Sequence, residues 1–370
     1  MNWHRITRLG LVVGIITLVA AACGPSTATS NSNWATETSA AGGGGMTALI
    51  AAAKAEGRLN VIALPPNWAN YGALISGFTA KYGIPITSAN PSGNSQDEVN
   101  AISAGTTRAP DVVDVGMAVA LANTSLFAPY QVATWNDILP SQKEPTGLWV
   151  QDYGGYMSIG YDSSKVPGGV INSIQDLLAP TGLKGKVALN GDPTKANAAL
   201  NGVMMASLAN GGSLDDISKG VDFFHQLNQL KNFTPVQATD ATVKSGATPV
   251  VFDWDYLSAA HGVDVPTWKV FVPSNAILGG YYAQAISKTA PHPAAARLWE
   301  EYLYSNEGQN LWLEGLARPV RMAAMQAAGT IDAAAAAKLP PANGTPVFLS
   351  AAQATAANAY LNAHWAAAIG

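Results

Sequence analysis

The chain has 370 residues, of which 48% are hydrophobic and 12% charged, with a formal net charge of -4 and a single cysteine. This length suits two lobes of ordinary domain size, and the composition excludes disorder over most of the chain. The charge excludes a basic footprint, so we expect no nucleic-acid partner. One cysteine excludes an internal disulfide and a thiolate cluster, and we expect no metal site and no cofactor.

The N-terminus has the pattern of an export signal. Residues 1–23 carry two arginines, then an apolar run from Leu9 to Ala22, then Cys23. The run falls short of the ~20 residues of a membrane span and fits a secretory signal. Small residues directly before Cys23 resemble the bacterial lipobox, with Ala20 where leucine is usual. We therefore predict a lipoprotein signal peptide over 1–23 with lipidation at Cys23; the alternative is an ordinary signal with an incidental cysteine.

The segment after the signal is rich in small and polar residues. Residues 24–45 consist mainly of Ser, Thr, Ala, Asn and Gly and end in four glycines. Such a composition predicts a flexible tether that holds the folded part away from the membrane.

From residue 46 on, helical and strand patterns alternate. A strand over 59–64, a helix over 68–82 and a second strand from 83 have the βαβ order of a parallel sheet. The remaining patterns predict helices over 46–56, 96–104, 195–209, 213–230, 293–304, 307–316 and from 322 onward, and strands over 110–115, 156–162, 185–189, 249–253, 268–272 and 281–286.

Five segments together resemble one protein family. They occur in the family's order across roughly residues 50–325, at 59–71, 109–115, 161–167, 173–187 and 292–321. The set is similar to the type II periplasmic binding proteins, the solute receptors of ABC importers. The branch with the greatest similarity includes polyamine-, ferric iron- and aminoethylphosphonate-binding proteins.

The resemblance implies a fold and a function. The fold is α/β, two-lobed, with hinge crossovers near 153–157 and 278–282 and a ligand cleft; 46–156 and 279–370 form lobe 1 and 157–278 form lobe 2. Ligand binding closes such lobes about their hinges. We expect a monomeric extracellular substrate-binding lipoprotein that captures a small polar solute and delivers it to the transmembrane subunits of an ABC permease. It would lie on the outer face of the cell membrane through its lipid anchor, or in the periplasm.

Ligands of open α/β sheets bind at the carboxyl ends of strands, and two such loops belong to the first lobe. Trp68 and Tyr71 follow the first strand and are candidates for stacking on a ligand, with packing under the helix as the alternative. Asn94 and Ser95 open a helix whose free N–H groups favour an anion, with plain capping as the alternative.

A third loop opens the helix predicted from residue 195. Asp192, Thr194 and Lys195 are its candidate ligand contacts. Polyamine-binding relatives carry acidic residues in this loop, and Asp192 retains one of them. Lys195 replaces a second acid, which disfavours a simple polycation and leaves room for a zwitterion. Capping of the helix by Asp192 is the alternative.

Two further candidate segments contain aromatic residues. Asp253 and Asp255 flank Trp254 at a strand end and suit an ammonium ligand through hydrogen bonds and cation–π contact. Ferric-binding relatives have adjacent tyrosines there, so iron is disfavoured; Asp255 alternatively caps the next helix. Of Tyr281 and Tyr282, one is expected to face the cleft and the other the core.

The sequence argues against an enzyme. No HExxH or GxSxG motif occurs, and we assign no catalytic residue. A secreted hydrolase using Asp253 and Asp255 remains a distant alternative, as does a scaffold lipoprotein. Among ligands, a polyamine-like or other amino compound comes first and an aminophosphonate second, followed by a sugar or ferric iron.

Overall fold

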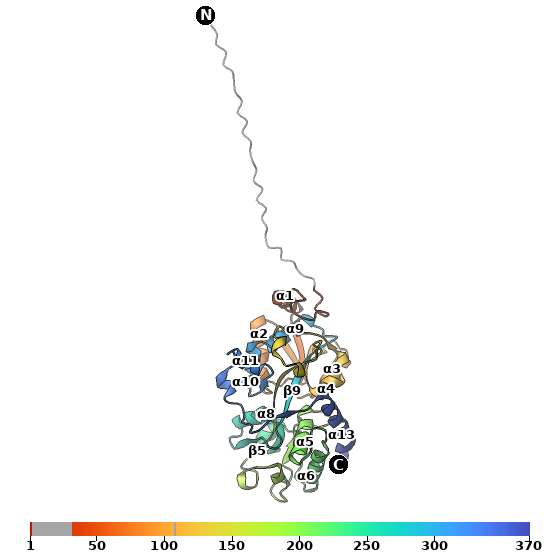
Figure 1. Cartoon of the computed structure of the whole chain (residues 1–370), viewed down its shortest axis with the longest axis vertical. Helices are drawn as coiled ribbons and strands as arrows, with labels where there is room; N and C mark the ends of the chain where they lie inside the picture. The colour runs from red at the N-terminus through yellow and green to blue at the C-terminus, as the bar shows by residue number, and fades with distance from the viewer. Residues whose placement is uncertain (2–31, 107–108) are drawn as a thin grey trace. The chain divides into compact units, whose positions relative to one another are not determined.

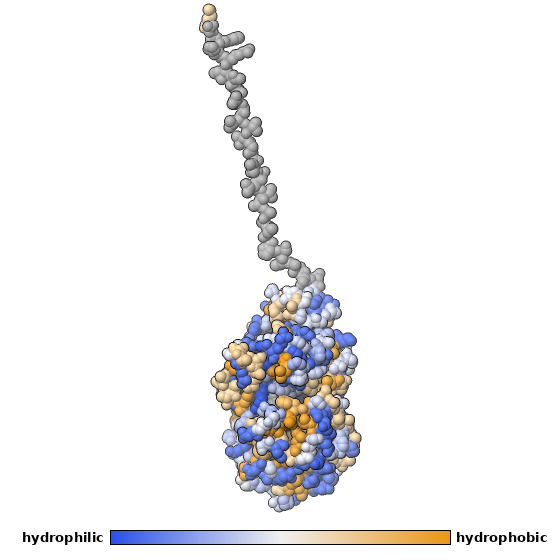
Figure 2. All heavy atoms as spheres, in the orientation of Figure 1, coloured by the Kyte–Doolittle hydropathy of each residue, from blue (hydrophilic) through white to orange (hydrophobic). Residues whose placement is uncertain are grey.

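The computed structural model describes Met1 and residues 32–106 and 109–370. The predicted signal peptide and its lipidation site, Cys23, lie outside the described residues. Ser32–Gly370 form one compact unit, in which helices surround the sheet strands (Figure 1). Among the described residues, no helix is both long and apolar enough for a membrane span. Hydrophilic and hydrophobic residues are interspersed over the face of this unit that Figure 2 shows.

The first strands form the predicted βαβ unit. Strand β1 (Leu59–Ile62) pairs in parallel with β2 (Ile86–Ala89), and α2 (Tyr71–Tyr82) connects them. The helix begins at Tyr71 and not at Trp68, because Ala69 and Asn70 have positive φ angles that a right-handed helix does not accept.

Strand β9 (Leu278–Ser287) organises the larger sheet. It pairs antiparallel with β3 (Val112–Gly116), β4 (Phe127–Ala128) and β5 (Val150–Asp162), and in parallel with β11 (Val347–Phe348). The short strand β10 (Arg318–Pro319) pairs with β5.

Strand β5 joins two groups of strands. Up to Tyr156 it pairs with β9, and from Met157 on it pairs with β7 (Val250–Trp254) and then also with β8 (Trp268–Phe271). Strand β6 (Val187–Leu189) adds to β7 in parallel. The change of partner falls where we expect the first crossing between lobes. The division of the chain into lobes at 156 and 279 stays a prediction.

Helices cover these sheets with the faces that their sequence patterns indicate. Helix α1 (Met46–Glu56) has the predicted bounds and packs against α9 (Pro293–Leu303), while α3 (Ser95–Ser103) packs on β3. The other helices are α4 (Met117–Ala122), α5 (Asn197–Ala209), α6 (Ser218–Gln229), α7 (Asp240–Ser245), α8 (Asp255–Ala260), α10 (Asn306–Glu314), α11 (Met322–Ala327), α12 (Ala333–Ala336) and α13 (Ala351–Ile369).

The C-terminal region is not one helical stretch. Two prolines at 340 and 341, Gly344 and Pro346 interrupt the alanine-rich pattern between α12 and α13, because proline removes a backbone donor and clashes with the preceding turn. Helix α13 packs against α4, α5 and α6. It buries Ala354, Ala357, Leu361 and Trp365, a stripe of helical spacing.

Residues 32–45 correct the tether prediction. Trp34 is only 6% exposed, and Ala40 is buried with it. Arg297, on α9, donates hydrogen bonds from Nε to the carbonyl of Glu37 (2.7 Å) and from Nη2 to that of Ala35 (3.3 Å). This part of the predicted tether is therefore held on the folded unit by the buried Trp34 side chain and by the hydrogen bonds from Arg297.

Candidate ligand-binding site

A cavity of about 390 Å³ lies where several strands end. Its walls include the loops after β1, β2 and β6, the ends of β3 and β7, the start of α5, and β9. Carboxyl ends of parallel strands are the usual ligand site of open α/β sheets. The lining residues are Ala63, Pro65, Asn67, Trp68, Pro91, Ser92, Gly93, Asn94, Ser95, Glu98, Asp114, Asn190, Ala196, Asn197, Ala198, Gln237, Ala238, Thr239, Asp240, Ala241, Asp253, Leu257, His261 and Tyr282.

The charged groups of this lining are acidic. Four carboxylates line the cavity, those of Glu98, Asp114, Asp240 and Asp253, whereas the described lining contains no lysine or arginine. The single histidine, His261, places Nδ1 3.2 Å from Oδ1 of Asp240. The electrostatic character of the cavity therefore favours a cation.

Asp114, near the end of β3, is held by two tyrosines. Its Oδ2 accepts hydrogen bonds from the hydroxyls of Tyr71 (2.8 Å) and Tyr153 (2.9 Å). The Tyr153 hydroxyl also accepts a hydrogen bond from Nε1 of Trp68 (2.6 Å). The backbone N–H of Asp114 donates to Oε2 of Glu98 (2.9 Å), so β3 and α3 place two carboxyl groups side by side.

Burial changes the acidity of these carboxyl groups. Desolvation raises the pKa of Asp114 to about 7, although the two tyrosine hydrogen bonds act in the opposite direction. Burial, followed by the charge of Asp114, raises the pKa of Glu98 well above its ordinary value. Asp114 is thus partly protonated near neutral pH in the empty cavity, because the charged form of a buried acid is poorly solvated.

Asp253, near the end of β7, lines the cavity with both of its carboxylate oxygens hydrogen-bonded. Its Oδ2 accepts a hydrogen bond from Nδ2 of Asn190 (2.9 Å), and its Oδ1 accepts one from the backbone N–H of Trp254 (2.8 Å). Burial raises the pKa of Asp253 to about 6, which the hydrogen bond from Asn190 partly offsets. The carboxyl is therefore oriented before any ligand binds.

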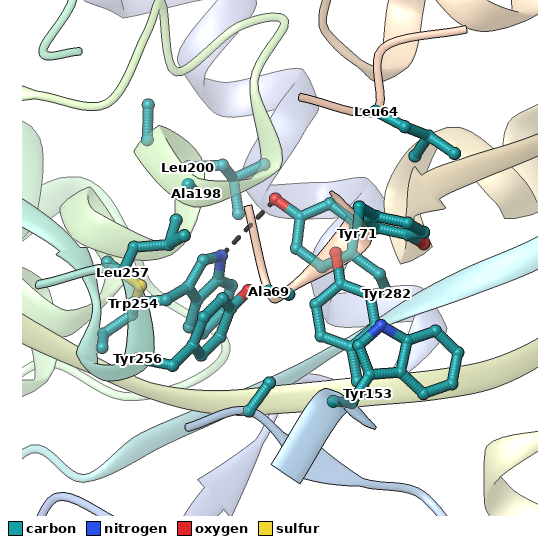
Figure 3. Close-up of a cluster of buried hydrophobic side chains, with 14 of the residues drawn as sticks. Leu64, Ala69, Tyr71, Tyr153, Ala198, Leu200, Trp254, Tyr256, Leu257 and Tyr282 are labelled. Carbon is teal, nitrogen blue, oxygen red and sulfur yellow. Dashed lines mark hydrogen bonds between the residues drawn. The ribbon is translucent and has the colours of Figure 1, made fainter. Parts of the chain in front are cut away.

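Aromatic side chains form one side of the site. The rings of Trp68 and Tyr282 meet edge to face with centroids 5.8 Å apart, and Tyr153 stacks on Tyr282 at 5.7 Å. Tyr282 accepts a hydrogen bond from Nε1 of Trp254 (3.4 Å), drawn as the dashed line in Figure 3. Electron-rich ring faces beside carboxylates are the surroundings that proteins use for ammonium groups.

The structure brings only some of the sequence-predicted residues to the cavity. Trp68, Asn94, Ser95, Asp253 and Tyr282 line it. The other seven, Tyr71, Asp192, Thr194, Lys195, Trp254, Asp255 and Tyr281, do not belong to the lining. Contact of any of these residues with a ligand stays a prediction.

Four of the residues away from the lining are engaged elsewhere. Tyr71 and Trp254 are fully buried and support Asp114 and Tyr282 from behind. Asp255 has no exposed side-chain surface and forms an ion pair with Arg318. Tyr281 packs on Phe348, so of the tyrosine pair it is Tyr282 that reaches the cavity.

The loop at 192–195 forms a turn ahead of α5, and Asp192 does not cap the helix, whose N-cap is Ala196. Oδ1 of Asp192 accepts hydrogen bonds from the backbone N–H and hydroxyl of Thr194 (2.9 and 2.7 Å), and Nζ of Lys195 lies 3.5 Å from Oδ2 of Asp192 in an exposed pair. These contacts fix the turn before α5, whose first residue is Asn197. Lys195 is therefore not among the charges of the cavity.

The N-terminus of α3 is already capped. Oδ1 of Asn94 accepts hydrogen bonds from the backbone N–H groups of Gln96 (3.0 Å) and Asp97 (3.2 Å). In turn, the carboxylate of Asp97 accepts a hydrogen bond from the backbone N–H of Asn94. Oγ of Ser95 accepts a hydrogen bond from Gly116. Since the donors are used and two acids occupy the first turn, this end of α3 does not favour an anion.

Sequence reasoning missed several polar residues of the site, among them Glu98, Asp114, Asn190, Asp240 and His261. Asp114 belongs to a segment that we used only as a family motif and a buried strand. An acid inside an otherwise apolar strand was the available signal, because a buried carboxylate requires a partner or a function.

Solved structures define the class of protein to which this fold belongs. A periplasmic binding protein from Actinobacillus pleuropneumoniae, with fructose-6-phosphate bound, has a TM-score of 0.64 at 17% identity, covering 84% of this chain and 98% of its own. A candidate spermidine/putrescine ABC transporter protein from Listeria monocytogenes has a TM-score of 0.63 at 13% identity (84% and 99%). Iron-bound HitA from Pseudomonas aeruginosa has a TM-score of 0.60 at 20% identity (82% and 97%). The fold is that of the two-lobed periplasmic binding proteins.

The sequence itself assigns the family. Residues 109–343 match the family described as bacterial extracellular solute-binding protein, and the chain belongs to that family. No curated protein sequence matches the chain. The chain is thus an extracellular solute-binding protein of the ABC transporter family. Such proteins bind small solutes and deliver them to permeases, which places this one in the periplasm or outside the cell.

Proposed function

We propose that this receptor captures a small, positively charged amino compound, of the polyamine type or similar to it. The observation that carries the proposal is the charge of the cavity. Four carboxylates face the space, and the described lining residues include no lysine or arginine. An ammonium group supplies both the charge and the N–H donors that these oxygens require.

The size and the aromatic wall support the same ligand class. A cavity of about 390 Å³ fits a small molecule and not a macromolecule. Trp68 and Tyr282 provide apolar surface for the methylene groups of an alkylamine and ring faces for its charge.

The same observations weigh against the alternative ligands. A phosphonate requires cationic or N–H partners, yet Lys195 points to Asp192 and the donors of α3 are capped. Ferric-binding relatives have adjacent tyrosines at the segment where this chain has Trp254 and Asp255, and Asp255 is paired with Arg318, which disfavours ferric iron. A neutral sugar brings no positive charge to a cavity whose charged lining is acidic.

Membrane attachment is the second part of the proposal. Cys23 follows a secretory signal with small residues before it, and we propose that it carries a lipid and keeps the receptor on the outer face of the membrane beside its permease. Lipid labelling of cells that express the protein tests this point. A Cys23→Ala variant is the control, and equal labelling of the two forms contradicts the proposal.

A thermal-shift screen tests the ligand class. The panel contains linear diamines, triamines, amino acids, an aminophosphonate, neutral sugars and ferric citrate. A ligand at 100 times its Kd stabilises the folded protein by about 2.7 kcal/mol. We expect the amines to raise the melting temperature. Stabilisation by a sugar, a phosphonate or ferric citrate, without any effect of amines, contradicts the proposal.

A further inference from the structure

The two carboxylate oxygens of Asp114 have different surroundings. Oδ2 is saturated by the hydroxyls of Tyr71 and Tyr153, whereas the buried Oδ1 has no hydrogen-bond partner among the described residues. The side chain lines the cavity, and the residue is only 6% exposed. A buried acceptor without a partner has lost its hydrogen bonds to water and gained none within the protein. The unpaired Oδ1 therefore requires an explanation.

Glu98 adds a second carboxyl group at the same place. It is 2% exposed, lines the cavity, and accepts the backbone N–H of Asp114 at Oε2. No lysine or arginine among the described residues forms an ion pair with either acid. Two neighbouring buried carboxyl groups without a cation are an electrostatically incomplete site.

We propose that Asp114 and Glu98 together form the ammonium anchor of the cavity, in which Oδ1 of Asp114 accepts an N–H of the ligand. This inference rests on the proposed function and assigns residues to it. Tyr71 and Tyr153 act as positioning residues, because their hydroxyls both bond Oδ2 and leave Oδ1 without a partner. The ammonium group of the ligand would supply the positive charge that the two acids lack as a partner.

Asp253 provides the matched comparison. It is also buried and also lines the cavity, but both of its oxygens already accept hydrogen bonds. An ammonium ligand would gain less binding free energy at Asp253, since neither of its oxygens lacks a hydrogen-bond partner. The structure thus favours Asp114 over Asp253 as the ligand anchor.

A proton balance follows from this assignment. The titratable groups that interact with Asp114 are Glu98 on α3, Tyr71 on α2, Asp152 and Tyr153 on β5, Tyr256 on α8, Tyr282 on β9 and Tyr304 at the end of α9, and Gln284 is its partner in the register of β3 and β9. Burial raises the pKa of Asp114 to about 7 and raises that of Glu98 above its ordinary value, so the pair binds a proton more readily than exposed acids do. A bound ammonium favours the ionised pair, so a proton passes from the carboxyl pair to solvent as the ligand binds.

Isothermal titration calorimetry of the purified protein tests this assignment. A linear diamine is titrated at pH 6, 7 and 8 in buffers of different ionisation enthalpy, which counts the protons released. For the wild type we expect proton release and an affinity that rises with pH over this range. Binding of the diamine without proton release at every pH overturns the inference and leaves the amine function standing.

Isosteric variants then identify the residues that cause the proton release. We expect Asp114→Asn to lower the affinity at least tenfold and to abolish most of the proton release, and Glu98→Gln to act in the same direction. Asp253→Asn should cost less affinity and keep the proton release. Tyr71→Phe and Tyr153→Phe should weaken binding while release persists. Equal binding and equal proton release by the wild type and Asp114→Asn overturn the assignment; absence of diamine binding by the folded wild type contradicts the proposed function itself.

Discussion

Nη1 of Arg318 lies 2.8 Å from Oδ2 of Asp255, and the two side chains are 12% and 0% exposed. The pair links β10 to the first turn of α8. Oδ1 of Asp255 accepts the backbone N–H of Tyr156 (3.0 Å), and the guanidinium of Arg318 lies over the Tyr156 ring, 4.2 Å from its centroid. The sequence had suggested Asp255 as a ligand contact, whereas here it fixes the place where β5 changes partners.

Arg318→Ala should destabilise the protein strongly. It leaves the carboxylate of Asp255 buried without its cation, and removal of one partner of a buried ion pair costs about 3–5 kcal/mol. Urea denaturation measures the loss. Lys81→Ala is the control, since its ion pair with Glu307 is exposed and should contribute less than about 1 kcal/mol. Similar small losses in the two variants contradict this account of the Arg318 pair.

Trp365→Ala should weaken the packing of α13 against the rest of the protein and lower the free energy of unfolding. The indole packs against the rings of Phe224 and Phe233, with centroids 5.5 and 6.1 Å away, and is buried. Truncation of a buried tryptophan costs about 3–5 kcal/mol of unfolding free energy. The exposed His364 on the same helix offers a comparison, because His364→Ala should cost less than about 0.5 kcal/mol. Thermal unfolding with equal shifts for both would show that α13 is not held by Trp365.

Gly154→Ala should disturb the packing of β5 on β9. A Cβ at this position would overlap the backbone carbonyl of Gly280, which cannot rotate away as a side chain can. Overpacking of this kind costs about 1–3 kcal/mol. Gly262→Ala is a control without such a clash, because a Cβ there meets no atom within 4 Å. Chemical denaturation that finds no difference between the two variants would argue against a tight contact at Gly154.

Stability should fall as pH rises from about 5 to 8. Burial raises the pKa of Asp253 to about 6, of Asp114 to about 7 and of Glu300 to about 8. An acid whose pKa is higher in the folded state binds more protons there, so its contribution is complete below the unfolded pKa, near 4, and is lost as pH rises through the folded value. Acids with lowered pKa values, such as Asp162, titrate below this window.

Urea denaturation at pH 5, 6.5 and 8 in the absence of ligand checks this slope. Glu300→Gln should flatten it, because the amide keeps the shape of the protonated acid and does not titrate. An increase of stability with pH over this interval, in the wild type, would contradict the assigned directions.

Local sequence patterns were sufficient for most of the fold. The predicted helix over 46–56 has the observed bounds of α1, and the βαβ order of β1, α2 and β2 is confirmed. These elements depend on periodicity and on end signals such as Gly57, which act within a few residues. The segment around Trp34 was predicted as a tether because the group that holds its carbonyls, Arg297 on α9, lies more than 250 residues away in the sequence.

The site was predicted less completely for the same physical reason. Loops at strand ends identified Trp68, Asp253 and Tyr282, whose place follows from the sheet alone. The Asp114 and Glu98 pair arises from a contact between a strand and a helix, and no spacing in the sequence indicates it. Asp255 looked equivalent to Asp253 until the structure showed Arg318 beside it.

The most direct test compares a linear diamine with the diol of equal length by calorimetric titration of the purified protein at pH 8. The two compounds share shape and hydrogen-bonding reach but differ in charge. A cavity whose described charged lining is acidic should bind the diamine and give no measurable heat of binding with the diol. Equal affinities for the two, or binding of the diol alone, would contradict the claim that charge selects the ligand.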